Sequence, residues 1–175
     1  MKTLKFAPYL VSLILSGEKT STWRLFDDKE LVAGDVLRLV NKETGEAFAV
    51  ARIVAVEEKA LGKIGDEDFS GHERFESTEK MFEAYRGYYG DKVNENTVVK
   101  MIDFEVLLKY GAHRHYKGKE YEVLGVARHS ETLEDMVVYR ALYGDLETWA
   151  RPLAMFIGEI EVEGKKMPRF AYVGE

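Results

Sequence analysis

Short apolar segments separated by turns fill the sequence from about residue 111 to its end. Residues 120–127 and 136–143 are rich in β-branched and aromatic side chains, and Gly118 and Gly164 mark turns in the same region. Segments this short bury their apolar faces only when they pair into a sheet that curls on itself. The tail therefore predicts a small SH3-like all-β barrel.

The N-terminal part adds two helices to a second set of strands. Residues 8–16 begin at a Pro and stop before Gly17, and residues 77–89 begin at a capping Ser and stop before Gly90, so both stretches predict helices. Predicted strands, the second and third of them an antiparallel hairpin, lie at residues 20–25, 36–40, 48–56 and 97–108.

These elements predict an α+β fold that is mostly β. A partly open β-barrel with two main helices comes first, and the small SH3-like barrel follows it. The pattern changes at residues 110–112, so the predicted domains are residues 1–109 and 110–175.

Charge and cysteine content exclude several classes of function. Lys and Arg number 25 against 31 Asp and Glu, a net charge of −6, so any contact with nucleic acid must be a local pocket. The absence of Cys excludes disulfides, thiolate zinc sites and thiol nucleophiles. The apolar run at residues 9–15 is far shorter than the roughly 20 residues of a membrane span. We expect a cytoplasmic protein with no membrane partner, no metal and no cofactor.

One string on the turn from the first helix to the first predicted strand carries chemistry. Lys19 lies in the turn after Gly17, and Thr22 and Arg24 share one face of the strand, so an ammonium, a hydroxyl and a guanidinium converge. A Thr hydroxyl becomes a nucleophile when a base takes its proton, and a Lys with a lowered pKa is such a base. The alternative is an ordinary polar strand edge with Lys and Arg in water.

Gly17, Lys19, Thr22 and Arg24 fit the pattern G-x-K-x-x-T-x-R, which resembles the ASCH domain. This family belongs to the PUA-like superfamily of β-barrels and is associated with RNA and modified nucleosides. The resemblance extends to about residue 108, and it implies a PUA-like β-barrel for the N-terminal domain.

Small bacterial N(4)-acetylcytidine amidohydrolases of that family use the motif Lys and Thr with a Glu from the long loop before the second helix. Carried over, Thr22 is the nucleophile, Lys19 its base, and Glu73 an acid or a clamp on the leaving amine. Arg24 anchors the ligand or Glu73, and Glu76 is the close alternative to Glu73.

Aromatic residues near the motif have two interpretations. Trp23 and the Tyr residues at 85, 88 and 89 offer rings on which a base stacks. Their helical spacing equally indicates core packing, which we favour for Tyr85. Trp23 is retained as a ligand-binding candidate.

The tail, from about Arg114 to Val173, resembles the domain of unknown function family 1653. The resemblance rests on the string H-Y-K-G-K-E-Y-E-V-L-G from residue 115, on H-S-E-T from residue 129 and on W-A-R-P-L-A-M-F from residue 149. This family implies no activity, and the module is a candidate for recruiting a protein partner. The adjacent residues 129–131 are interpreted as a turn cluster, because neighbouring side chains diverge too much to form a triad.

The expected function is recognition of RNA or a modified nucleoside in the ASCH cleft. The leading enzymatic hypothesis adds hydrolysis of an N-acyl amide on a nucleobase, as in N(4)-acetylcytidine. The alternative is a non-catalytic RNA-binding reader or adaptor in which the same residues only hydrogen-bond a base and phosphate.

Overall fold

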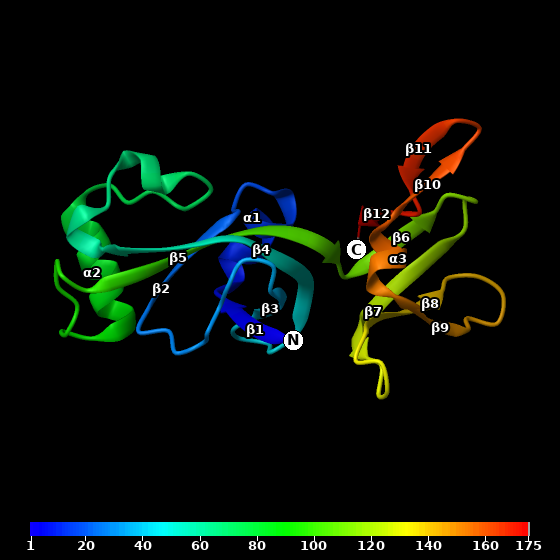
Figure 1. Ribbon diagram of the computed structural model, residues 1–175, viewed down its shortest axis with the longest axis horizontal. Helices are drawn as coiled ribbons and strands as arrows, with labels where there is room; N and C mark the ends of the chain where they lie inside the picture. Colours follow the sequence, from blue (N-terminus) through cyan, green and yellow to red (C-terminus); the bar gives the residue numbers. More distant parts are fainter. Residues whose placement is uncertain (175) are drawn as a thin grey trace. The chain divides into compact units, whose positions relative to one another are not determined.

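The computed structural model describes residues 1–174. The chain divides into two units, one holding residues 1–45 and 50–106 and the other holding residues 46–49 with residues 107 onward (Figure 1). Strands account for 47% of the residues and helices for 19%, so the predicted mostly-β fold class is confirmed.

A curled, half-barrel sheet forms the first unit. Its strand order is β1-β3-β4-β5-β2, with β1 parallel to β3 and β2 antiparallel to β5. The first strand was not predicted, and its parallel pairing departs from the mostly antiparallel order that the sequence indicated. The strands are β1 (Lys2–Phe6), β2 (Ser21–Leu25), β3 (Val36–Asn41), β4 (Ala47–Ala60) and β5 (Val98–Lys109).

Both predicted helices of this unit are confirmed. The first, α1 (Pro8–Ser16), ends at Gly17, whose left-handed backbone lets its N–H reach the Ile14 carbonyl at 3.1 Å. The second, α2 (Thr78–Tyr89), begins after Ser77, whose hydroxyl accepts a hydrogen bond from the Lys80 amide. Two 3-10 turns, η1 (Leu61–Lys63) and η2 (Asp66–Phe69), lie in the loop between β4 and α2.

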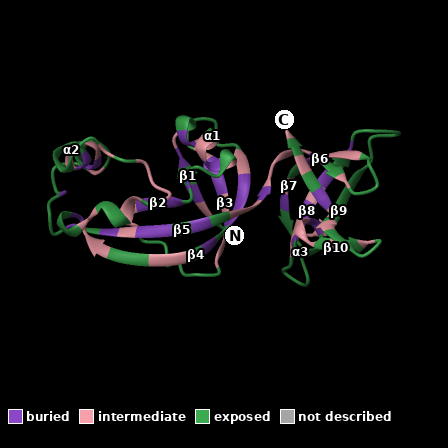
Figure 2. Cartoon of the chain, turned by 90° about the horizontal axis from the view of Figure 1, so that it is seen from above, coloured by how far each residue is buried: buried purple, intermediate pink, exposed green. Residues whose placement is uncertain are grey.

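The core beside the motif joins the end of the sheet to α2. It contains Trp23 from β2 and Tyr85 from α2, so the core-packing interpretation of Tyr85 is confirmed. Figure 2 shows the buried residues that run along β5. The buried members of this cluster are Trp23, Leu25, Leu61, Met81, Tyr85, Val93, Val99 and Met101.

A second five-stranded sheet, in the order β12-β6-β7-β8-β9, forms the second unit. Strand β6 begins almost directly after Lys109, within the residues where the sequence pattern changes. A separate hairpin pairs β10 (Glu159–Val162) with β11 (Lys165–Pro168). The sheet strands are β6 (Gly111–His115), β7 (Glu120–Arg128), β8 (Asp135–Ala141), β9 (Thr148–Pro152) and β12 (Phe170–Gly174).

One short helix, α3 (Leu153–Ile157), is an addition that the sequence analysis did not predict. Its Leu153 and Phe156 are buried, as expected for residues three apart on one helical face. Phe156 stacks on Phe170 of β12 with ring centroids 4.0 Å apart, so α3 closes the core of this unit. Among residues 1–174, none of the helices has the length and apolar character of a membrane span.

Candidate functional site

The turn that follows α1 directs the Lys19 side chain into the protein interior. Because Gly17 ends the helix in the left-handed region, the chain reverses and the Lys19 amide donates to the Leu13 carbonyl at 2.9 Å. The Lys19 side chain is only 4% exposed. The alternative of a solvated Lys at a strand edge is therefore wrong for this residue.

Strand β2 places Thr22 and Arg24 on the same face, as the alternation predicted. Thr22 is buried and Arg24 is half-buried. The Arg24 guanidinium donates to the Lys5 carbonyl at 2.8 Å and lies 5.1 Å from the centre of the Phe6 ring. Its Nε is buried without a hydrogen-bond partner, so part of its donor capacity is unused in this structure.

The long loop is tied to the start of β2 through Gly71. Its carbonyl accepts hydrogen bonds from both the Thr20 and Ser21 amides at 2.9 Å. Gly71 has φ +68°, and a Cβ there would lie 2.1 Å from the Thr20 hydroxyl oxygen. Only glycine fits this close approach, which carries the next two residues, His72 and Glu73, to the motif.

Glu73 meets Lys19 inside the site. The Lys19 ammonium donates to Oε2 of Glu73, whose side chain is 31% exposed. The His72 Nδ1 lies 3.5 Å from the same Oε2 and 2.8 Å from the Glu73 carbonyl oxygen. Since a carbonyl only accepts, Nδ1 carries a proton in this contact. Of the two predicted carboxylates, the structure brings Glu73 to Lys19, whereas Glu76 is exposed.

Burial sets the protonation of the cluster. It lowers the pKa of Lys19 below its ordinary value, and Arg24 lowers it further, although Glu73 acts in the opposite direction. Burial and the positive charge of Lys19 lower the pKa of His72 to about 4. Burial alone would raise the pKa of Glu73, but Lys19 and His72 outweigh it and hold that pKa below its usual range. At neutral pH, His72 is uncharged and Glu73 is ionised.

A cavity of about 370 Å³ joins these groups. Its walls combine aromatic rings with four Lys and Arg side chains and a single carboxylate, Glu73. The predicted residues Lys19, Thr22, Trp23, Arg24 and Glu73 all line it, and Glu76 does not. The complete lining is Lys5, Phe6, Ala7, Tyr9, Leu10, Lys19, Thr22, Trp23, Arg24, Lys42, His72, Glu73, Phe75, Ala84, Tyr85, Tyr88 and Tyr89.

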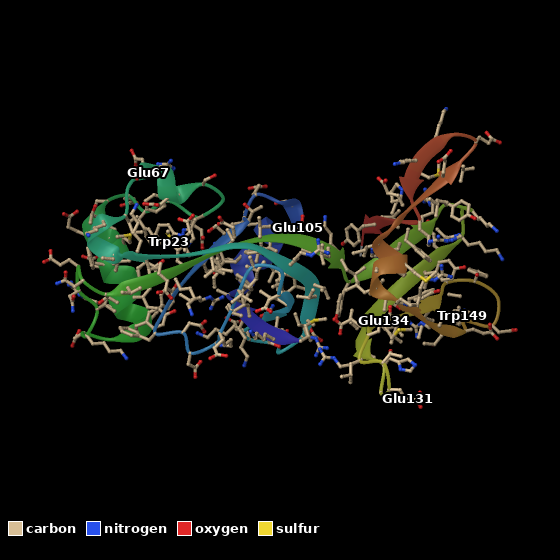
Figure 3. The ribbon with its side chains drawn as sticks, in the orientation of Figure 1. Trp23, Glu67, Glu105, Glu131, Glu134 and Trp149 are labelled. Atoms are coloured by element: carbon tan, nitrogen blue, oxygen red, sulfur yellow. The ribbon has the colours of Figure 1, made fainter. Side chains whose placement is uncertain are left out.

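Sequence reasoning missed two residues of this site. His72 is one, and its only sequence signal was its position next to Glu73. Tyr9 on α1 is the other, whereas Tyr88 on α2 was already a candidate for stacking a base. Both line the cavity and are 62% and 66% exposed, so their rings are open to a ligand. Trp23, labelled in Figure 3, is instead 4% exposed. Within residues 1–174, no group of three His, Cys, Asp or Glu side chains is placed to hold a metal ion.

Comparison with known proteins identifies the second unit. Residues 111–172 match the family model described as "Protein of unknown function (DUF1653)". A crystal structure of a DUF1653 protein from Bordetella bronchiseptica is 41% identical, over 38% of this chain and 87% of its own, with a TM-score of 0.36. The chain therefore belongs to the DUF1653 family through residues 111–172.

Solved ASCH domains are also similar to this chain. The ASCH domain from Lactobacillus crispatus JV V101 is 18% identical, over 57% of this chain and 71% of its own, with a TM-score of 0.48. ASCH from Zymomonas mobilis is 13% identical, over 59% of this chain and 65% of its own, with a TM-score of 0.45. No protein with a curated description matches.

Proposed function

We propose that the cavity of the first unit binds a modified nucleoside, free or within RNA, and hydrolyses an N-acyl amide on its base. One observation carries the proposal: Lys19, Thr22 and Glu73 line the same cavity, with Lys19 buried and hydrogen-bonded to Glu73. The match of residues 17–24 to the ASCH motif supports the same assignment.

The size and lining of the cavity favour a nucleoside. Its volume of about 370 Å³ is at the small end of ligand sites, and a single ring system with a sugar is a ligand of that scale. The exposed rings of Tyr9 and Tyr88 offer faces for a base. Lys5 and Lys42 add positive charge suited to a phosphate of an RNA chain.

The chemistry would proceed in two steps. In the first, a neutral Lys19 takes the Thr22 proton while Oγ attacks the acyl carbon; the C–N bond then breaks, and Lys19 returns the proton to the departing exocyclic nitrogen. In the second, water hydrolyses the acyl ester on Thr22, releasing a carboxylic acid and restoring the hydroxyl. Glu73 orients Lys19 and is placed to hold the leaving amine. The lowered pKa of Lys19 supports its role as base.

A non-catalytic reader is the second candidate, and one contact favours it. The Lys19 ammonium donates to Glu73, and within residues 1–174 no hydrogen bond joins Lys19 to Thr22. The Glu73 carboxylate favours the protonated form of Lys19, against the effect of burial, and a protonated Lys19 suits a cation that grips a ligand. In a reader, Lys19 and Arg24 dominate affinity and no turnover occurs.

Product release and calorimetric titration on matched variants separate the two candidates. With acylated nucleosides as substrates, Thr22→Val removes the hydroxyl at constant volume and should abolish turnover while affinity changes little. Thr22→Ser should retain part of the rate, and Lys19→Arg should lower it by about 10² to 10⁴-fold because guanidinium does not lose its proton. Full turnover by Thr22→Val eliminates the nucleophile assignment.

A further inference from the structure

Aromatic rings gather on the face of the second sheet that α3 partly covers, where Phe156 contacts Phe170 and Tyr139. His115 on β6 pairs with Phe170 on β12, and their ring centroids are 4.8 Å apart. Tyr121 on β7 lies 5.7 Å from the same Phe170 ring. Because side chains of cross-strand neighbours point to the same face, these three rings form one surface, here called the aromatic face.

Two further rings extend this face toward solvent. The Tyr143 ring meets Tyr121 edge to face at 5.4 Å, with the hydroxyl oxygens 2.5 Å apart. Trp149 on β9, labelled in Figure 3, pairs with Tyr139, which itself contacts Phe170. Trp149 is 50% exposed and Tyr143 36% exposed. A flat ligand therefore has ring surface to stack on.

The cations beside the aromatic face lack carboxylate partners. Arg151 lies 5.7 Å from the centre of the Phe170 ring, and Lys119 lies 4.2 Å from that of Tyr143. Burial is the main cause that lowers the pKa of His115. The positive charges of three nearby groups lower it further, and these are Arg151, Arg169 and Lys117. Within residues 1–174, none of these four Lys and Arg side chains forms an ion pair.

Other Arg side chains of the same unit are paired. Arg114 binds Glu120, and Arg140 binds Glu122. Four cations without an ion pair thus lie near these rings, although the sequence from residue 111 onward is not basic overall. Rings with unpaired cations between them are suited to alternating bases and phosphates.

We propose that the aromatic face is a binding site for single-stranded nucleic acid, with bases stacked on Tyr143 and Trp149 and a phosphate held by Arg151. Duplex is excluded as the main ligand because its bases are already stacked and cannot reach the rings. The site lies wholly in the second unit and does not rest on the amidohydrolase proposal. Trp149 and Arg151 belong to the W-A-R-P string, so the proposal gives that string a function.

Fluorescence anisotropy of a labelled octanucleotide of uridine, titrated with the full chain, tests the phosphate contact. Arg151→Gln should weaken binding by at least about tenfold, and the slope of log affinity against log salt should fall by about 0.7. Arg140→Gln removes the same charge from a paired residue of the same unit and should change affinity less than about twofold. Lys117→Gln, in an exposed turn, is a second variant that cannot disturb the core.

Trp149 reports on stacking directly. Titrating the same octanucleotide should quench tryptophan emission in the unmodified protein, and Trp149→Ala should lose that quenching and at least about fivefold in affinity. Equal losses in Arg151→Gln and Arg140→Gln overturn the proposal, as does tighter binding of a duplex or of a Glu-rich peptide than of the single strand. Absence of saturable binding below about 1 mM also overturns it. Turnover of acylated nucleosides, measured on the same variants, should be unchanged.

Discussion

The imidazole of His72 lies nearly parallel to the indole of Trp23, with ring centroids 4.1 Å apart and planes at 21°. Phe69 contacts the same indole at 4.9 Å. Trp23 is therefore covered by the long loop and anchors it, whereas the open rings of the cavity are those of Tyr9 and Tyr88. The stack holds His72 in place, and the next residue of the loop, Glu73, meets Lys19.

Gly71→Ala should detach this loop. The new Cβ would lie 2.1 Å from the Thr20 hydroxyl oxygen, and φ +68° strains any L side chain. We expect a loss of about 1 to 3 kcal/mol in the free energy of unfolding, measured by urea denaturation. We also expect a loss of the turnover that is proposed for the cavity of the first unit. Gly45→Ala is the matched control, because φ is +76° and no atom lies within 4 Å. Equal losses from both would show that strain alone, not the loop contact, matters.

His72 should make stability depend on pH. Its pKa is about 4 in the folded chain against an ordinary 6.5, so the unfolded chain binds more protons between these values. The stabilisation is complete above pH 6.5 and is lost as pH falls toward 4, up to about 3 kcal/mol.

Urea unfolding across this pH range checks the His72 prediction. His72→Phe keeps a flat ring on Trp23 and removes the titration, so its stability should fall less steeply between pH 6.5 and 4. Burial also lowers the pKa of His113 and of His115, so part of the slope should remain. An unchanged slope in His72→Phe would contradict the assignment, and NMR titration of the ring would then report a pKa near its ordinary value.

Sequence patterns correctly predicted those features of the fold that depend on interactions between residues near one another in the chain. The α1 helix, its Gly17 end and the shared face of Thr22 and Arg24 follow from periodicity and capping, and the structure confirms them. The turn at residues 129–131 is also confirmed, since the His129 ring accepts hydrogen bonds from the Glu131 and Thr132 amides.

Long-range contacts could not be predicted from the sequence. The parallel pairing of β1 with β3 joins segments more than thirty residues apart, and nothing in residues 2–6 specifies its partner. The choice between Glu73 and Glu76 depends on Gly71, whose carbonyl bonds to Thr20 and Ser21 across the fold. In the second unit, α3 is stabilised by the packing of Phe156 on Phe170, a contact that no local pattern encodes.

The last prediction tests which loop carboxylate serves the site. Glu73→Gln leaves Lys19 buried without its anionic partner, which should lower unfolding stability by about 1 to 3 kcal/mol. Because the Glu73 charge raises the pKa of Lys19, its removal should lower that pKa further and move the acid limb of the kcat/KM profile to lower pH. In parallel, kcat should fall by about 10² or more if Glu73 holds the leaving amine.

Glu76→Gln removes the same charge three residues later, from an exposed side chain outside the cavity. It should leave stability within about 0.5 kcal/mol and kcat within about twofold, because an exposed carboxylate contributes little. The comparison needs pH–rate profiles and urea unfolding of the two variants under identical conditions. If Glu76→Gln shifts the acid limb and lowers kcat while Glu73→Gln does not, then the contact between Lys19 and Glu73 is structural only and the catalytic carboxylate is Glu76.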